Sequence, residues 1–276
     1  MYKDNIFIPI GDAAEALLFN ANKTDCISTG IRSVDEITGG LKKGGLVLLA
    51  ARPGMGKTQF CMNIAYNAAK ATGRKSVFCT YENSAEQIAA RAVWMLTGVH
   101  PREIKNNEDS YLDEGLRKAA KELQDIDVQV FQGYDLIGSF LEKLRGVDNL
   151  GLVVIDYLQI CSLGSKFASI AEEKQKLLLV FKQAAHELGV PIIVISQVTR
   201  ECEYREDKRP IISDLFIENI DILADDIIFL YKDSYYHEGN DDDNTCECIV
   251  AKSRDHSSGV AELRLENNGG KYTDIE

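Results

Sequence analysis

One stretch of this sequence constrains the fold more than any other. The apolar run Leu46–Ala50 is followed at once by Ala51-Arg52-Pro53-Gly54-Met55-Gly56-Lys57-Thr58. Small residues let backbone N–H groups close around phosphate oxygens, and a helix that begins there points the positive end of its dipole at the same anion. In such a loop Lys57 would reach the β- and γ-phosphates of a nucleotide, and the Thr58 hydroxyl would hold Mg²⁺. Ala51 stands where the strict pattern has glycine, but the strand before the loop and the helical segment Gln59–Ala71 after it favour a nucleoside triphosphate site over a glycine-containing turn.

The remaining pattern is that of an α/β protein. Near-continuous apolar strands joined by helices are typical of a mainly parallel sheet that is covered on both faces. Such strands are expected at Leu46–Ala50, Ser76–Thr80, Val128–Phe131, Leu152–Asp156 and Ile192–Ser196. Helices are expected at Gln59–Ala71, Ala85–Leu96, Asp113–Leu123, Ile137–Leu144 and Ala171–Leu188. Beyond Pro210 no long helix separates the apolar runs, which indicates antiparallel C-terminal strands at Ile227–Tyr231, Glu247–Lys252 and Val260–Leu265.

The chain is expected to consist of an N-terminal arm, residues 1–25, and one domain, residues 26–276. Within the arm, apolar residues recur at helical spacing from Ile10 to Ala21, with Asp12 near the start. A helix this short is marginal alone, so its apolar stripe must dock on its own domain or on a neighbouring subunit.

Composition limits the kinds of partner. The 31 Lys and Arg residues against 43 Asp and Glu give a net charge of −12, so any contact with nucleic acid must be confined to a local basic strip. No apolar run approaches membrane-spanning length and the N-terminus has no signal-peptide pattern, which favours a cytoplasmic protein without membrane contact. The seven scattered cysteines indicate free thiols and not a zinc site. The acidic run Glu238–Asn244 is expected to be a surface loop and not a calcium site.

Polar residues follow three of the expected strands. In open parallel sheets ligands bind at the carboxyl ends of the strands. Asp156 ends an apolar strand of the Walker-B type and could orient Mg²⁺ or its water shell. Glu82 is placed to polarise water for attack on the γ-phosphate, and the Gln197 amide could sense that phosphate. A strand-ending carboxylate that only closes a turn is the alternative for Asp156 and Glu82. Phosphoryl transfer depends on positioning and charge neutralisation, and this set supplies both.

Two further cations stand near the C-terminus. Strand alternation puts Lys252 and Arg254 on one face, where they form an exposed basic edge on the simplest interpretation. If the chain forms a ring, the same pair could reach the nucleotide of the adjacent subunit as an arginine finger with a lysine beside it.

The motifs together resemble the motor domain of DnaB-type replicative helicases, from about residue 11 to about residue 270. The matching segments keep the family's order along the chain. They are Ser28-Thr29-Gly30, Asp35, Thr38-Gly39-Gly40-Leu41, Ala50–Thr58, Glu82 with Ser84-x-Glu86-Gln87 and Arg91, Val154–Gln159, Ser196–Arg200, Asp207–Pro210 and Lys252-x-Arg254.

The resemblance implies a RecA-like P-loop NTPase that binds ATP and Mg²⁺ at the subunit interfaces of a homohexameric ring and moves 5′→3′ along single-stranded DNA. It makes Glu82 the catalytic base, Lys252 and Arg254 the cations that act in trans, and the N-terminal helix a linker that docks on the neighbour. Replicative helicases of this family also carry a sizeable N-terminal domain that meets primase. Before the motor domain this sequence has only a segment of about the length of the linker, which is expected of a motor-only protein or of a fragment.

The loop that grips DNA departs from the family pattern. The family reads Ser-Asp-Leu-Arg-Glu-Ser-Gly, whereas this chain reads Ser213-Asp214-Leu215-Phe216-Ile217-Glu218-Asn219-Ile220 and lacks the arginine and glycine. An apolar and acidic loop has no electrostatic reason to hold a DNA backbone. The candidates that remain are Arg200, Arg205, Lys208 and Arg209, with Lys166 in the other candidate channel loop; a solvated surface is the alternative for all of them.

Three functions are compatible with these observations. The leading hypothesis is a helicase or translocase motor that serves replication or a mobile element, with a protein partner from that system. The second is a DnaB-derived, ATP-switched assembly protein that unwinds nothing, which the charge and the altered loop favour. A strand-exchange protein of the RecA/RadA type shares the core fold, but Asp156-Tyr157-Leu158-Gln159 and Lys252-x-Arg254 argue against it.

Overall fold

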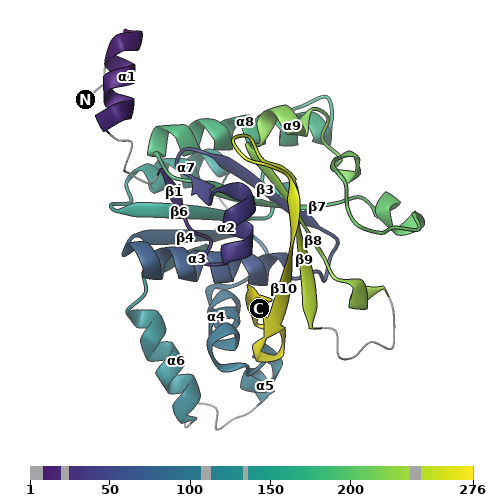
Figure 1. Ribbon diagram of the computed structural model, residues 1–276. Coiled ribbons are helices and arrows are strands. Elements are labelled where there is room, and N and C mark those ends of the chain that lie inside the picture. The colour runs from purple at the N-terminus through teal and green to yellow at the C-terminus, as the bar shows by residue number, and fades with distance from the viewer. Residues whose placement is uncertain (1–8, 20–24, 107–112, 133–135, 237–243, 276) are drawn as a thin grey trace.

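The computed structural model describes residues 9–19, 25–106, 113–132, 136–236 and 244–275. These residues form a nine-stranded sheet with helices on both faces (Figure 1). From one edge to the other its strands are β11 (Lys271–Asp274), β10 (Gly259–Glu266), β9 (Thr245–Lys252), β8 (Asp226–Tyr231), β3 (Leu46–Ala51), β7 (Ile192–Gln197), β6 (Leu150–Asp156), β4 (Lys75–Thr80) and β5 (Val128–Gln132).

The six strands from β8 to β5 are parallel, and β9, β10 and β11 are antiparallel additions. The expected fold, a mainly parallel sheet with antiparallel C-terminal strands, is confirmed. One strand differs from the expectation: the sequence pattern predicts β8 to be antiparallel, but it pairs parallel to β3 and antiparallel only to β9. The long irregular segment after β7 carries the chain across β3 without a long helix.

The helices divide between the two faces. One apolar core lies under α2 (Arg32–Thr38), α3 (Lys57–Thr72) and α4 (Ala85–Thr97), and the other lies under α7 (Ile137–Arg145), α8 (Ile170–Leu188) and α9 (Ile220–Leu223). Because both faces are covered, all six residues of β3 are buried, as are all seven of β6. β3, which leads into the phosphate-binding loop Ala51–Thr58 (the P-loop), is therefore closely packed on both faces.

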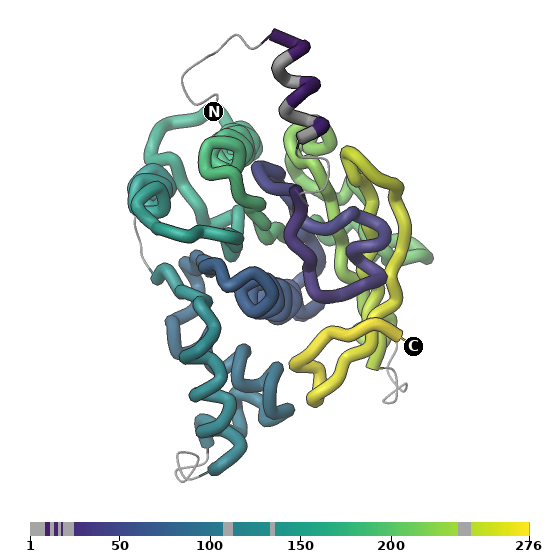
Figure 2. Tube along the Cα trace, turned by 60° about the vertical axis from the view of Figure 1, so that its left-hand side comes forward, coloured from purple at the N-terminus to yellow at the C-terminus, as the bar shows by residue number. Residues whose placement is uncertain are grey.

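The short elements complete the chain. The tube in Figure 2 shows α5 and α6 beside α4, at the end of the molecule away from α1. The remaining helices and strands are α1 (Ile10–Phe19), β1 (Cys26–Ile27), β2 (Leu41–Lys42), α5 (Pro101–Asn106), α6 (Glu114–Gln124) and the 3₁₀ turns η2 (Leu158–Ile160), η3 (Arg200–Tyr204), η4 (Ile212–Asp214), η5 (Asp233–Tyr235) and η6 (Asn267–Gly269).

The expected N-terminal helix is present as α1. It stands away from the sheet and its covering helices (Figure 1), and Ile10 and Leu18 are 87% and 76% exposed. Two apolar side chains of its expected stripe are thus not covered by the described part of this chain. None of the helices in that part has the length and apolar character needed to cross a bilayer. The acidic run Glu238–Asn244 lies outside the described residues except for its last member.

Candidate active site

The P-loop leaves β3 at its carboxyl end and leads directly into α3. Gly54 and Gly56 have φ angles of 83° and 89°, a region that other residues rarely adopt. A Cβ on Gly56 would lie 2.2 Å from the Tyr272 hydroxyl oxygen, so no side chain fits there. Gly56 caps α3 without any side-chain hydrogen bond, and the first N–H groups of the helix remain for an anion.

Lys57 occupies the floor of this loop. Its ammonium group donates hydrogen bonds to the carbonyl oxygens of Ala51 and Arg52, at 2.9 and 3.0 Å, and the residue is only 9% exposed. Burial lowers the pKa of Lys57 to about 8, although the negative charge of Asp156 opposes this shift. The structure therefore holds a desolvated cation beside the phosphate cradle.

Thr58 and Asp156 meet at the expected metal position. The Thr58 hydroxyl lies 2.8 Å from Asp156 Oδ2 and donates a hydrogen bond to it. Asp156 ends β6 beside Thr80 of β4, and burial raises the pKa of its carboxyl group. A hydroxyl and a carboxylate oxygen side by side at the end of a P-loop are the ligands that Mg²⁺ takes in nucleotide sites, so the two residues fit that ion.

A cavity of about 570 Å³ opens above these groups, and Glu82 and Gln197 both line it. Gln197 ends β7 beside Ala51 of β3, and Glu82 follows β4. The structure thus brings together eight of the expected site residues around one cavity: Pro53, Gly54, Gly56, Lys57, Thr58, Glu82, Asp156 and Gln197.

The position of Glu82 is set by the start of α4. The Ser84 hydroxyl accepts a hydrogen bond from Gln87 N, and the Gln87 side chain accepts one from Ser84 N, which forms a capping box. Asn83 N also donates to the Thr80 hydroxyl at 3.0 Å. The Ser84-x-x-Gln87 motif therefore acts as a helix start that fixes the turn after β4.

Sequence reasoning missed much of the cavity wall. Arg91 belongs to one of the motifs that resemble the helicase family, whereas the sequence assigns no role to Arg102, Lys232 or Tyr272. All four residues line the same cavity. Lys232 follows β8 at its carboxyl end and lies over the Tyr272 ring at 5.6 Å. The sequence did not reveal Lys232, because β8 was expected to be antiparallel and only its parallel pairing with β3 brings its carboxyl end to the site. The final strand that brings Tyr272 there was not predicted.

Arg52 ties the P-loop to the segment after Gln197. Its Nε donates to Glu203 Oε1 at 2.8 Å, and one of its terminal nitrogens donates to the Val198 carbonyl at 3.1 Å. The Arg52 side chain is only 11% exposed, so this ion pair is largely shielded from solvent. The loop that holds phosphate and the segment that carries the expected DNA contacts are therefore in direct contact.

Lys252 and Arg254 lie near the amino ends of the parallel strands, whereas the P-loop lies at their carboxyl ends. Lys252 ends β9 beside Ile227, near the start of β8, whereas the P-loop follows the end of β3, which runs parallel to β8. The strand stops at Lys252, so alternation along β9 does not place Arg254, which lies in the bend beyond it; that part of the expectation was wrong. The pair is brought together by a common anchor instead: Lys252 donates to the Ala224 carbonyl and Arg254 to the Asp225 carboxylate.

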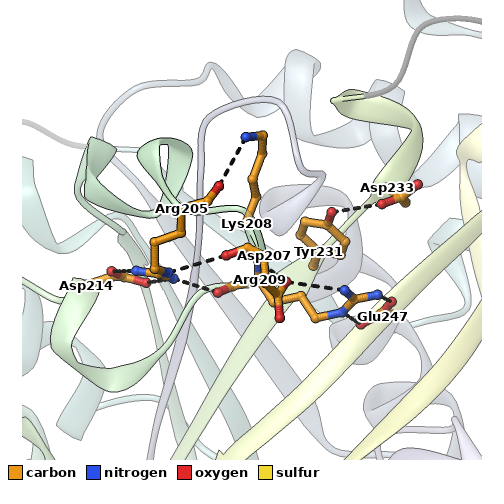
Figure 3. Close-up of polar contacts among 8 residues, drawn as sticks. All are labelled: Arg205, Asp207, Lys208, Arg209, Asp214, Tyr231, Asp233 and Glu247. Carbon is orange, nitrogen blue, oxygen red and sulfur yellow. Dashed lines mark hydrogen bonds and ion pairs between the residues drawn. The ribbon is translucent and has the colours of Figure 1, made fainter.

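Three of the five expected DNA contacts have partners within the chain (Figure 3). Arg205 donates to both carboxylate oxygens of Asp214, at 2.6 and 2.8 Å. Arg209 donates to both carboxylate oxygens of Glu247, and its guanidinium lies 4.9 Å from the centre of the Tyr231 ring. Lys208 donates to the carbonyl oxygens of Glu203 and Arg205. These bonds fasten the segment after η3 to η4 and to the sheet.

The other two candidates, Arg200 and Lys166, have exposed side chains. The altered loop Ser213–Ile220 is folded inward: Leu215 and Ile217 are 7% and 4% exposed and belong to the core beneath α8. The apolar side chains of this loop thus have a packing role in the structure.

Comparison with known proteins places the chain. Residues 26–274 match the family model of the DnaB-like helicase C-terminal domain. The replicative DNA helicase DnaB of Geobacillus stearothermophilus is 30% identical over 279 residues, which cover 99% of this chain and 62% of that protein. A probable replicative DNA helicase of Trieres chinensis is 34% identical over 261 residues, which cover 90% of this chain and 57% of that protein.

Solved structures agree with this assignment. The ATPase domain of G40P superposes with a TM-score of 0.88 at 27% identity and covers 97% of this chain and 99% of that domain. A DnaB-like replicative helicase, described together with its interactions with primase, gives a TM-score of 0.85 at 26% identity over 99% of this chain and 68% of that one. The chain spans about three fifths of the length of the two related helicases, and it belongs to the DnaB-like helicase C-terminal domain family.

Proposed function

We propose that this chain is an ATP-hydrolysing motor of the DnaB type, which forms a ring with ATP at its subunit interfaces and acts on single-stranded DNA in replication or mobile-element DNA metabolism. The observation that carries the proposal is the division of the expected site between the two ends of the parallel strands. The P-loop, Asp156, Glu82 and Gln197 lie at the carboxyl ends, whereas Lys252 and Arg254 lie at the amino ends. In a head-to-tail ring each of these two faces can meet the complementary face of a neighbour.

The chemistry follows from the positions of the side chains. Lys57 and the N–H groups at the start of α3 bind the phosphates of ATP, and Thr58 and Asp156 would hold Mg²⁺, which neutralises charge on the β- and γ-phosphate oxygens. Glu82, beside the cavity, accepts the proton of the attacking water, and Gln197 contacts the γ-phosphate. Arg254 and Lys252 of the adjacent subunit stabilise the charge that develops on the transferred phosphoryl group, a contribution that reaches 10³–10⁵-fold for arginine fingers.

One further feature supports a ring. α1 carries Ile10 and Leu18 uncovered at its surface, which suits a linker arm, residues 1–25, whose helix docks on the neighbouring subunit. The domain proper, residues 26–276, coincides closely with the segment matched by the family model. A related DnaB-like replicative helicase has been described together with its interactions with primase. We propose that a replication protein such as primase is a partner of this chain.

The track is proposed to be a single DNA strand, held chiefly by Arg200 and Lys166. These two cations are exposed, whereas Arg205, Lys208 and Arg209 are engaged within the chain. Few phosphate contacts would give a weak grip that salt reduces only moderately, because each neutralised phosphate contributes a slope of about −0.7 on a log–log plot.

Mixed rings test the shared site. Lys57→Ala subunits lack a working P-loop but present a normal Arg254, and Arg254→Ala subunits are the reverse. Each variant alone should hydrolyse ATP poorly, and a mixture should regain activity at interfaces that combine the two intact halves. Arg264→Ala, an exposed arginine on β10, is the control and should remain active alone. Absence of recovery at every mixing ratio would rule out a trans role for Arg254.

A further inference from the structure

Asp225 is fastened to the first residue of the P-loop strand. Its backbone N–H donates to the Leu46 carbonyl at 2.8 Å, and its Oδ2 accepts a hydrogen bond from Leu46 N at 2.9 Å. The residue is 6% exposed and comes immediately before β8. Two hydrogen bonds to one buried residue hold the carboxylate in a single orientation.

The other carboxylate oxygen faces two cations. Asp225 Oδ1 accepts hydrogen bonds from Arg254 at 2.7 Å and from Lys182 at 3.2 Å. Burial alone would raise the pKa of Asp225, but the bonds from Leu46, Arg254 and Lys182 outweigh it and the pKa is lowered. The group is therefore charged, and Leu46 and Lys182 already satisfy it without Arg254.

The backbone around Asp225 holds Lys182 a second time and one further lysine, Lys252. Lys252 donates to the Ala224 carbonyl, and Lys182 donates to the Leu223 carbonyl at 3.0 Å. The short segment Leu223–Asp225 is thus a platform that orients both of the cations proposed to act on the neighbour's nucleotide.

The Arg254–Asp225 bond contributes little to folding. The Arg254 side chain is 60% exposed, and ion pairs at such positions contribute little to stability. What the bond does is restrict the direction of an otherwise mobile guanidinium. One terminal nitrogen of Arg254 is engaged, in a guanidinium that carries five N–H donors on a largely exposed side chain. Such preorganisation of a charge lowers the cost of reorganisation during the reaction.

We infer that Asp225 is a positioning residue for Arg254, which it aims from the start of β8 at the nucleotide bound by the adjacent subunit. This inference rests on the proposed trans site. Because Asp225 is bonded to Leu46, the cation that a subunit offers is anchored on the same buried strand, β3, whose other end carries the P-loop of that subunit.

The test compares Asp225→Asn with Asp221→Asn, which removes an exposed carboxylate on α9, four positions earlier in the chain. In Asp225→Asn the amide can still accept from Leu46 N but cannot pair with the guanidinium. We expect kcat for ATP hydrolysis to fall about tenfold or more while KM changes less than twofold, because the cis phosphate site is untouched. Asp221→Asn should match the wild type.

Mixed rings separate positioning from a structural role. Asp225→Asn subunits should recover activity with Lys57→Ala subunits, which supply an intact Arg254, and should not recover with Arg254→Ala subunits, which are defective in the same half. The double variant Asp225→Asn/Arg254→Ala should be no slower than Arg254→Ala alone. A loss of kcat that Lys57→Ala subunits do not rescue would overturn the inference.

A second variant covers the case in which Asp225→Asn does not fold. Asp225→Glu keeps the charge and displaces the guanidinium by one methylene, so it should fold and show the same fall in kcat. Wild-type rates in the folded variant would overturn the inference. If Arg254→Ala itself hydrolyses ATP normally, the proposed trans site fails; if Arg254→Ala is slow and the folded Asp225 variant is not, only the positioning role fails.

Discussion

The Thr58 hydroxyl and Asp156 Oδ2 lie 2.8 Å apart, joined by a hydrogen bond between the first turn of α3 and the end of β6. Two segments about a hundred positions apart in the sequence meet there. The contact exists because β3 and β6 lie on either side of β7 and both run parallel to it. The carboxyl ends of all three strands therefore lie on the same side of the molecule. The contact defines the point where a metal ion would join the protein to the phosphates.

Asp156→Asn should bind nucleotide but hydrolyse ATP slowly. The amide can still accept from Thr58, but it removes the negative charge that would hold Mg²⁺, so we expect kcat to fall on the order of 10²–10³-fold. Steady-state ATPase rates over a range of Mg²⁺ concentrations measure the effect. Asp148→Asn, at the other end of the same strand with a 90% exposed side chain, is the matched control. Equal Mg²⁺ dependence in both variants would contradict the assignment.

Glu82→Gln should separate binding from hydrolysis. The glutamine keeps the shape of the turn after β4 but cannot accept a proton, and loss of a general base reduces rates by about 10²–10⁴-fold. Lys57→Ala, by contrast, should abolish tight nucleotide binding. Equilibrium binding of a fluorescent ATP analogue and single-turnover hydrolysis distinguish the two. Normal turnover in Glu82→Gln would show that another group is the base.

Nucleotide affinity should depend on pH through Lys57. Its pKa in the folded protein is about 8, below the ordinary 10.5. The cation that binds phosphate is therefore present below pH 8 and is lost above it, so the affinity for ADP should be flat up to pH 7.5 and should then fall toward tenfold per pH unit. Isothermal titration at constant ionic strength measures this. An affinity that stays constant to pH 9.5 would mean that Lys57 keeps its ordinary pKa.

The lowered pKa of Lys57 also predicts that the loss of ADP affinity at high pH is not caused by an effect of Lys57 on folding. Between pH 8 and 10.5 the unfolded chain binds a proton at Lys57 that the folded chain does not. The contribution of Lys57 to the free energy of unfolding therefore rises with pH in this window. Thermal denaturation at each pH is the control that separates weaker binding from unfolding.

Arg205→Ala should destabilise the fold, whereas Arg209→Ala should not. Asp214 is 1% exposed, and without Arg205 its buried charge keeps only the hydrogen bond from Ile211 N. We expect the free energy of unfolding to fall by about 2–3 kcal/mol. Arg209 is 44% exposed, and its pair with Glu247 is worth about 0–1 kcal/mol. Urea denaturation of both variants checks this, and equal losses would contradict the distinction.

Most of the fold was predictable because the five central strands, β8, β3, β7, β6 and β4, are buried on both faces and read as apolar runs. The direction of β8 was not, since parallel strands usually require a helical crossover and the segment between β7 and β8 has only short helical turns. The final strand β11, with two of its four residues half-buried and one exposed, has no apolar run to reveal it.

The candidate site divides in the same way. Lys57, Thr58, Asp156 and Gln197 were predictable, because each follows or ends a strand of the parallel sheet. The wall formed by Tyr272 depends on β11 and could not be foreseen from local pattern. Arg205 and Arg209 show another limit of prediction from sequence. Their positions in the chain are evident, but their ion pairs with Asp214 and Glu247 appear only in the folded structure.

The most direct test of the account is the ATPase rate with and without single-stranded DNA, at low and at physiological salt, with Glu82→Gln as the blank. For a motor that moves on a single DNA strand, we expect DNA to stimulate hydrolysis at low salt and salt to reduce the stimulation. Arg200→Ala with Lys166→Ala should remove the stimulation while the basal rate remains. A robust rate that is indifferent to DNA at both salt concentrations would contradict this expectation and would favour an ATP-switched assembly protein.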